Sequence, residues 1–184
     1  MGYYTIATKG DSSIFGELAV KGRKAFTGSN GTRGIFGSTR GGTPGETNIW
    51  INTIEYVSIM TTGNAQDFGD VTVARSNTNN SMTSSTRMVM QGGVLLPGYT
   101  NTIDYITMAS KGDAIDFGDT GSGAEAGTAV SSSTRGVFLP GTPSNGNTIE
   151  YITISTTGNS SNFGDLSFGR RVYGSACDSH GGLG

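Results

Sequence analysis

Acidic residues recur in this chain at spacings that could bind a divalent cation. The motif DFGD occurs twice, and two weaker copies keep part of it. The copies occupy residues 67–70, 116–119, 162–165 and 15–17. Carboxylates and turn carbonyls are Ca²⁺ ligands, so Asp67 with Asp70 and Asp116 with Asp119 form candidate sites. Because each copy has at most two acids, we favour a tight turn in which Asp caps backbone N–H groups and Gly takes a positive φ.

Arginine and tyrosine recur with this motif. The arginines are Arg33, Arg87 and Arg135, and the tyrosines are Tyr3, Tyr56, Tyr105 and Tyr151. A ring of arginines could bind an anion. Repetition favours a structural role instead, with hydrogen bonds to carbonyls or pairing with Glu55, Asp104 and Glu150 of the neighbouring strand. Exposed tyrosines could stack on sugar rings, but we favour packing between units with the hydroxyl at the edge.

Few residues of the chain could support catalysis. His180 is the single histidine, in the tail DSHGGLG, and Cys177 is the single cysteine. A Ser-His-Asp triad or a multi-histidine metal site therefore has one candidate at most, and no disulfide can form within the chain. No pattern supplies a converging acid–base pair. We predict that the protein is not an enzyme and has no catalytic, metal or cofactor-binding residues.

All these residues belong to a repeat of about 50 residues. Three near copies begin with NTIEY or NTIDY and end with FGD, and a divergent fourth begins partway through the unit. They span residues 52–70, 101–119, 147–165 and 2–17. Their Phe residues are 53, 49 and 46 residues apart. A period of this size is typical of a solenoid, a propeller or another array.

Composition indicates the class of fold. Only 34% of residues are hydrophobic and 14% are charged, while glycine occurs 31 times. Ile, Val, Tyr, Phe and Thr recur at fixed offsets between Gly-rich turns, which is typical of short strands. No stretch shows capped helical amphipathicity. We predict an all-β fold with essentially no helix.

The chain starts and stops partway through a unit, and the two partial units together restore a whole one. A radial array must pair its first and last edges, which a blade built from both termini would do. We therefore predict a single domain, 1–184, forming a small β-propeller of about four blades. The units are 21–75, 76–120, 121–172, and 173–184 plus 1–20. The alternative is a partial propeller or β array closed by oligomerisation.

The unit resembles a kelch-type repeat: SSSTRGVF, a variable loop, NTIEYITI, and the Arg-containing DFGDVTVAR. Its Gly-Gly pair is intact only at Gly92–Gly93, and Phe163 and its equivalents stand near the place of the usual Trp. The sequence of the unit is more similar to repeats in virion-associated and tail-fibre-like proteins of tailed phages, notably those of marine bacteria and cyanobacteria. This resemblance implies a particle component or adhesion module, and it names no ligand.

Charge and hydropathy bound the partners and the location. The net charge of −2 gives no electrostatic footprint for nucleic acid or an anionic membrane surface. No apolar run is long enough for a transmembrane helix, and MGYYTIATKGD lacks the features of a secretory signal. We expect synthesis in the host cytoplasm and a final location in the virion, without membrane insertion or nucleic-acid binding.

The function predicted from these features is a structural or attachment component of a phage tail, fibre or capsid. It would present loops to other virion proteins or to host-surface glycans, and copies of the chain are further candidate partners. The alternative is a lectin-like propeller with one shallow carbohydrate site per blade. The loops lie at 38–51, 76–84, 93–100 and 139–146. The candidate contact residues are Thr43, Glu46, Trp50, Asn79, Leu96, Tyr99, Pro140 and Asn145.

Overall fold

The computed structural model describes residues 1–20, 22–23, 26–37, 40–41, 49–76, 80–125, 127–139, 141, 146–171 and 174–177. These residues form antiparallel strands and turns, and no helix occurs among them. The all-β prediction is therefore confirmed. With no helix in the described ranges, none that could cross a membrane is present there.

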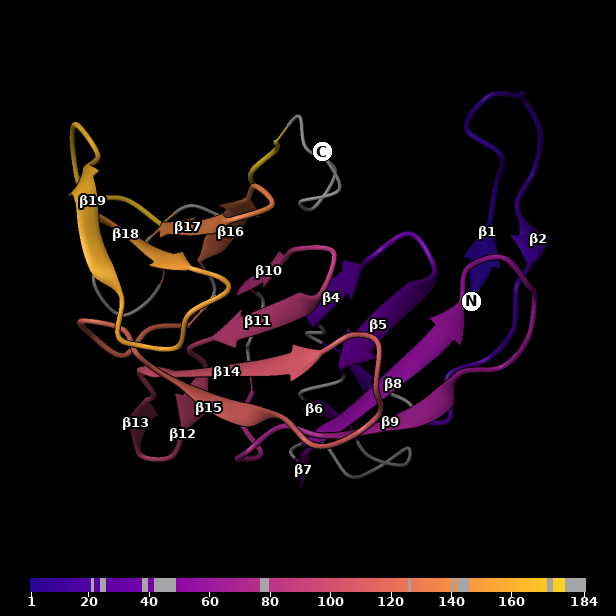
Figure 1. Cartoon of the computed structure of the whole chain (residues 1–184), viewed down its shortest axis with the longest axis horizontal. Helices are drawn as coiled ribbons and strands as arrows, with labels where there is room; N and C mark the ends of the chain where they lie inside the picture. The colour runs from indigo at the N-terminus through magenta and orange to yellow at the C-terminus, as the bar shows by residue number, and fades with distance from the viewer. Residues whose placement is uncertain are drawn as a thin grey trace.

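Three four-stranded sheets dominate the molecule (Figure 1), and we call them sheets 1, 2 and 3. Sheet 1 contains β4 (Phe26–Ser29), β5 (Arg33–Gly37), β8 (Thr53–Ser58) and β9 (Gln66–Asp70). Sheet 2 contains β10 (Asn80–Thr83), β11 (Arg87–Gln91), β14 (Thr102–Thr107) and β15 (Ile115–Asp119). Sheet 3 contains β16 (Thr128–Ser131), β17 (Arg135–Leu139), β18 (Thr148–Thr153) and β19 (Ser161–Asp165). In each sheet the strands pair in chain order, so the chain runs up and down across the sheet.

Three smaller sheets lie outside the large ones. A two-stranded hairpin joins β1 (Gly2–Tyr3) to β2 (Ser13–Ile14), and another joins β12 (Val94–Leu95) to β13 (Gly98–Tyr99). A three-stranded sheet contains β3 (Gly22–Arg23), β6 (Arg40–Gly41) and β7 (Ile49–Trp50). We call residues 1–17, which include β1 and β2, the N-terminal hairpin.

The DFGD motif lies in a strand, so the prediction of a tight turn is wrong. Its first copy is in β9 and its second in β15, and the register shifts opposite each of them, between Ile54 and Glu55 and again in sheet 2. Such a shift marks a β-bulge, an extra residue that bends the strand and often requires glycine. The expected positive φ is confirmed, at +149° for Gly69 and +146° for Gly118.

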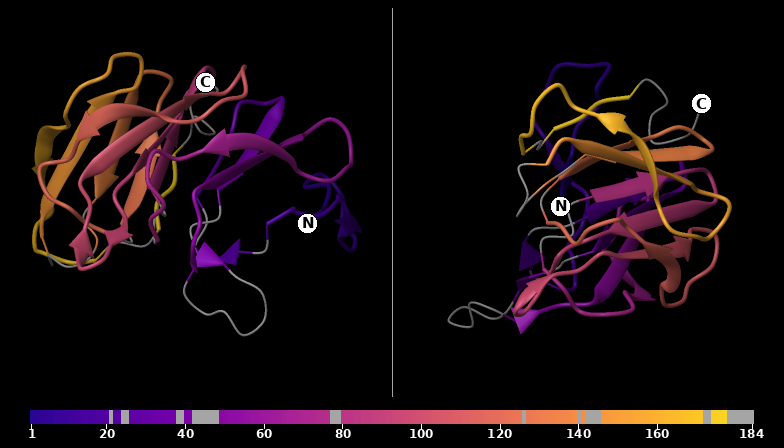
Figure 2. Two further views of the ribbon diagram at one scale, coloured as in Figure 1. Left: turned by 90° about the horizontal axis from the view of Figure 1, so that it is seen from below. Right: turned by 90° about the vertical axis from the view of Figure 1, so that its left-hand side faces the viewer.

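The three sheets stand side by side in an arc. Residues of their first strands, β4, β10 and β16, line a hollow of about 750 Å³. The N-terminal hairpin flanks sheet 1, whereas β19 lies at the opposite end of the arc (Figures 1 and 2). Residues 174–177 lie beside sheet 3, where Ser175 Oγ donates to the carbonyl of Ala129 at 2.8 Å. Among the described residues, the N-terminal hairpin is thus bonded to sheet 1 and Ser175 to sheet 3, and no sheet contains both. Met1, Gly2 and Cys177 line the same hollow, and Val172 and residues 178–184 fall outside the described residues.

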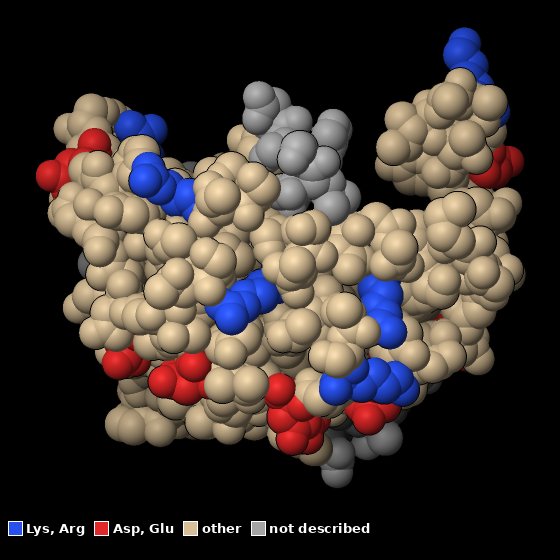
Figure 3. All heavy atoms as spheres, in the orientation of Figure 1, with Lys and Arg blue, Asp and Glu red and all other residues tan. Residues whose placement is uncertain are grey.

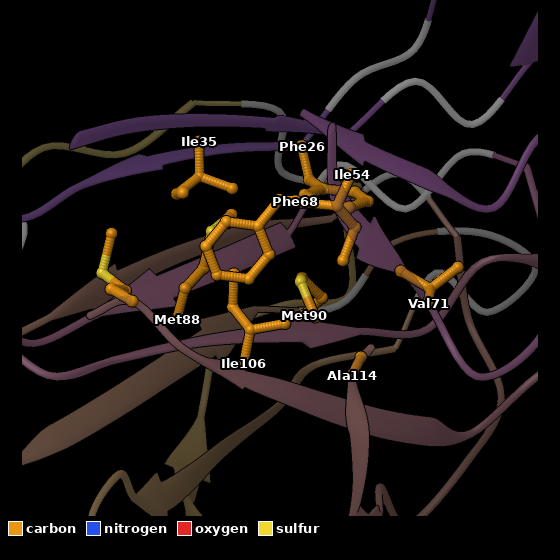
Figure 4. Close-up of a cluster of buried hydrophobic side chains, with 10 residues drawn as sticks. Phe26, Ile35, Ile54, Phe68, Val71, Met88, Met90, Ile106 and Ala114 are labelled. Atoms are coloured by element: carbon orange, nitrogen blue, oxygen red, sulfur yellow. The ribbon is translucent and has the colours of Figure 1, made fainter. Parts of the chain in front are cut away.

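The hydrophobic core consists of one cluster between each pair of neighbouring sheets. The first lies between sheets 1 and 2, where the ring of Phe68 meets Met88, Met90 and Ile106 (Figure 4). The second lies between sheets 2 and 3 and contains Met82, Val89, Ile103, Phe117, Phe138, Ile152 and Ile154. Face-to-face packing of sheets explains why the strands carry apolar residues on both faces.

Candidate functional site

Each unit pairs its Tyr ring with the Phe ring of its own FGD segment. The ring centroids are 5.9 Å apart in three units and 6.1 Å apart in the fourth, and the planes meet at 76–88°. The pairs are Tyr3–Phe15, Tyr56–Phe68, Tyr105–Phe117 and Tyr151–Phe163. Edge-to-face contact is the preferred geometry of aromatic pairs. These pairs lie within one unit, whereas the predicted packing is between units. That packing is confirmed for Tyr56 and Tyr105, which lie against the clusters between neighbouring sheets.

Two of the repeated arginines, Arg33 and Arg87, bind the next sheet through a backbone carbonyl. Arg33 Nη1 donates to Met108 O at 2.7 Å, and Arg87 Nη1 donates to Ile154 O at 3.1 Å. Of the two predicted structural roles, carbonyl binding is confirmed. The guanidinium groups also cover the tyrosine rings, at 4.5–5.0 Å from the ring centroids in Tyr56, Tyr105 and Tyr151. This coverage counts against sugars stacking on those ring faces.

In three of the units a turn is bonded to the FGD or FGE segment of the preceding unit. Two N–H groups of the turn donate to carbonyls of that segment, and one side-chain oxygen of the turn accepts from its N–H. We call these three hydrogen bonds the latch. It is formed by turns 63–65, 112–114 and 158–160 with residues 15–17, 68–70 and 117–119, respectively, over 2.7–3.0 Å.

The latch between sheets 1 and 2 illustrates its geometry. Gly112 N–H donates to Phe68 O at 2.8 Å, Ala114 N–H donates to Asp70 O at 2.7 Å, and Asp113 Oδ1 accepts from Asp70 N–H at 3.0 Å. A Cβ on Gly69 would clash with the backbone of Gly112, so glycine permits this close approach. Sequence patterns identified the turns but not these partners, because the latch joins residues 40–48 positions apart.

Sheet 3 carries the same surface with nothing bonded to it in the described part of the chain. Gly164 has a φ of +150°, like Gly69 and Gly118, yet no atom lies within 4 Å of the position its Cβ would take. Phe163 is 52% exposed, whereas its equivalents Phe68 and Phe117 are 2% and 3% exposed. We call this surface the open face. It consists of Arg135, Val137, Ile149, Phe163, Gly164 and Asp165.

A buried ion pair among the described residues was not predicted. Arg75 Nη1 and Asp104 Oδ2 are 2.7 Å apart, and their side chains are 1% and 0% exposed. Arg75 Nε donates to Gly92 O at 2.8 Å, and Thr72 Oγ1 donates to the same carboxylate at 2.8 Å. The partner of Asp104 is therefore Arg75, in the connection from sheet 1, and Arg87 binds a carbonyl instead.

The described contact residues lie between the second and third strands of sheets 1 and 2. Leu96 and Tyr99 are in or next to the β12–β13 hairpin, 79% and 39% exposed, and Trp50 is half-buried in β7. Because the strands run up and down, the connections between the second and third strands of each large sheet lie on the same side of the arc. Figure 2 shows the β3–β6–β7 sheet and the β12–β13 hairpin on that side. Thr43, Glu46, Asn79, Pro140 and Asn145 lie outside the described residues.

All four predicted loops contain strand residues. Within 38–51, residues Arg40–Gly41 form β6 and Ile49–Trp50 form β7, and Leu139, the first residue of 139–146, ends β17. Within 76–84, residues Asn80–Thr83 form β10, the first strand of sheet 2. Within 93–100, the chain folds into the β12–β13 hairpin. Paired backbone hydrogen bonds stabilise these segments, which polar composition alone had assigned to loops.

The acidic residues do not gather into a metal-binding group. Among the described residues, no three His, Cys, Asp or Glu side chains are placed to hold one ion. Desolvation raises the pKa of Asp70, and the nearby charges of Asp113 and Asp67 raise it further. Charged side chains are scattered over the face in Figure 3 in small groups of either sign. The Ca²⁺ site at Asp67 with Asp70, or at Asp116 with Asp119, stays an untested alternative to the structural role that the sequence favours.

Comparison with known proteins found no match to any protein-family model and none to any curated protein sequence.

Proposed function

We propose that this chain is a non-enzymatic structural or attachment component of a phage particle that acts by docking to other proteins. The observation that supports this best is the open face of sheet 3. It repeats a surface that binds a neighbouring unit elsewhere in the same chain. Repeat proteins bury their faces by stacking units, so an uncovered face of this kind is suited to a protein partner. The resemblance of the repeat sequence to repeats of virion-associated proteins supports a location in the phage particle.

The scaffold that we propose is a β-propeller with the three large sheets as blades. Its support is that β4, β10 and β16 surround one hollow and that successive sheets meet through the same latch. The N-terminal hairpin provides the outer strands of a further blade, because it carries the Tyr–Phe pair and a latch to sheet 1. A propeller of this kind holds its connecting loops rigidly for contact with a partner.

The second contact region that we propose is the side of the arc that carries β7 and the β12–β13 hairpin. Leu96 is exposed there and Tyr99 partly exposed, and aromatic and large apolar side chains are typical anchors of protein interfaces. Many weak contacts of this kind gain strength when a particle displays many copies.

Mass spectrometry of purified virions tests the proposal. The chain is expected to co-purify with particles of the phage that encodes it, at a fixed ratio to the capsid or tail proteins. Its presence in infected-cell lysate but not in the particles would overturn the proposal. Fluorescently labelled protein added to host cells then separates attachment from purely structural docking. A Leu96→Asp, Tyr99→Ser variant provides the control for the proposed contact side.

A further inference from the structure

We propose that the open face of sheet 3 binds the N-terminal hairpin of a second copy of this chain, in a head-to-tail contact. This inference rests on the proposed role of sheet faces in docking, and it names the partner. The contact would be a fourth copy of an interface that the chain already makes three times, at residues 15–17, 68–70 and 117–119.

The hairpin already has the shape that the contact requires. Counting from Tyr3, residues Ile6, Gly10, Asp11 and Ser12 occupy the places that Ile154, Gly158, Asn159 and Ser160 occupy from Tyr151. Gly10 has a φ of +155°, close to the +153° of Gly158. Ile6 is 93% exposed, whereas Ile154 is 1% exposed and lies in the cluster around Phe117.

The open face shows the complementary pattern. Val137 and Ile149 of sheet 3 are half-buried, whereas their sheet 2 equivalents, Val89 and Ile103, are 0% exposed. Arg135 lies over its own tyrosine ring, as Arg33 and Arg87 do, and is exposed. Apolar surface of this kind gains free energy when it is covered.

The repeat fixes which atoms should pair in the contact. Gly10 N–H would donate to Phe163 O, and Ser12 N–H would donate to Asp165 O. Asp11 Oδ1 would accept from Asp165 N–H, as Asp113 accepts from Asp70. The backbone of Gly10 would lie against Gly164, which has no atom within 4 Å of the position its Cβ would take.

Two further contacts follow from the same equivalences. Arg135 would donate to the carbonyl of Ile6, as Arg33 does to Met108. The Ile6 side chain would cover Phe163.

A second copy fits the face better than the hairpin of the same chain. The hairpin is latched to residues 63–65 of sheet 1, so it moves with that sheet. Figures 1 and 2 place it and β19 at opposite ends of the arc. In such a heterologous contact, one surface of each copy binds a different surface of the next copy, and the repeated contact produces rings or filaments.

The segment beyond sheet 3 supports the same arrangement. Ser175 Oγ donates to Ala129 O at 2.8 Å, as Ser81 Oγ donates to Thr27 O at 2.6 Å between the first strands of sheets 2 and 1. Residues 174–177 therefore occupy the place of the first strand of a following sheet. The hairpin of the second copy would provide the outer strands of that sheet.

The first experiment measures mass in solution by light scattering over a range of concentrations, with reductant because Cys177 is exposed. The wild-type chain is expected to form dimers or larger species. Ile6→Asp should weaken assembly at least tenfold, because it places a charge in the contact. Ile14→Asp is the matched control, since Ile14 is 87% exposed and the equivalent positions carry Asp or Asn. A wild-type chain that stays a single copy throughout would overturn the proposal, as would equal effects of the two substitutions.

The second experiment mixes two variants that cannot assemble alone. Phe163→Asp blocks the face, and Ile6→Asp blocks the hairpin. The mixture should form a one-to-one heterodimer that does not grow further, because one good face and one good hairpin remain. Heterodimer formation also requires both variants to fold. A mixture that stays unassembled would overturn the proposal, whereas the virion measurement above reports separately on the proposed function.

Discussion

Single side chains fix how the connection from sheet 1 enters sheet 2. The carboxylate of Asp104 in β14 accepts from Arg75 and Thr72, which both lie in the connection that follows β9. Removing one member of a buried ion pair leaves a charge without compensation, which costs more than the pair itself contributes.

We expect Asp104→Asn to lower the free energy of unfolding by about 3–5 kcal/mol, because the guanidinium of Arg75 stays buried without its anion. Urea denaturation monitored by circular dichroism measures the change. The double substitution Arg75→Met, Asp104→Leu should recover most of the loss, since it removes both charges. A double variant that is less stable than Asp104→Asn would contradict this account.

The raised pKa of Asp70 has a consequence for stability against pH. The folded chain binds this proton more tightly than the unfolded chain, so ionisation of Asp70 lowers stability as pH rises from 3.8 through the folded pKa. Asp70→Asn should therefore stabilise the protein at pH 7, by about 0.5 kcal/mol at this partly exposed position. The gain should fade towards pH 4 in thermal or urea unfolding. Asp113→Asn, which keeps the accepting oxygen, should act in the same direction.

At the scale of elements, the FGD strands are shaped to receive the next unit. The bulge turns two carbonyls of the strand towards the following turn, and glycine at its centre keeps the surface flat enough for the backbone to approach. Gly118 and Gly164 share this conformation, but only Gly118 has a neighbour, at Gly158. Comparing substitutions at these two glycines therefore separates the cost of backbone strain from the cost of losing the close contact.

Gly164→Ala should destabilise the chain by about 1–2 kcal/mol, the cost of a positive φ for a residue with a Cβ. Gly118→Ala should lose about 1–3 kcal/mol more, because its Cβ would also overlap the backbone of Gly158. Urea unfolding in the Ile6→Asp background measures both without a contribution from assembly. Equal losses in the two variants would show that the close approach has no energetic weight.

The whole molecule is an array in which each sheet packs mainly on its neighbours. Sheet 2 has clusters on both sides, and Met88, Val89 and Ile103 within it are 0% exposed. Sheet 3 has a cluster on one side and the open face on the other. Stability in such an array is a sum of unit and interface terms, so it falls towards an uncovered end.

Hydrogen exchange should report this gradient. In dilute protein, amides of β17 and β18 should exchange at least tenfold faster than the equivalent amides of β11 and β14, because sheet 3 opens without breaking two clusters. At concentrations where copies assemble, the difference should shrink as the open face is covered. Uniform protection of the two sheets in dilute protein would contradict the gradient.

The sequence by itself determined the repeat, the strands and the aromatic pairs. These features depend on residues that are close along the chain or at a fixed offset from one another. Tyr and Phe twelve residues apart fall on neighbouring strands of one hairpin, and β-branched residues between Gly-rich turns form strands in most contexts. The packing role of Tyr56 and the positive φ of Gly69 could therefore be predicted.

Only the tertiary structure decided how the units meet. Three features depend on how the sheets pack. They are the choice of Arg75 over Arg87 as partner of Asp104, the bulge in place of a turn at DFGD, and the attachment of the hairpin to sheet 1 and of Ser175 to sheet 3. We attribute them to the angle between packed sheets. That angle is set by the volumes of side chains such as Met88, Met90 and Phe68 from different units, and spacing along the chain does not encode it. For this reason, the spacing of residues along the chain predicted the repeated units but not how neighbouring units pack or which face is left uncovered.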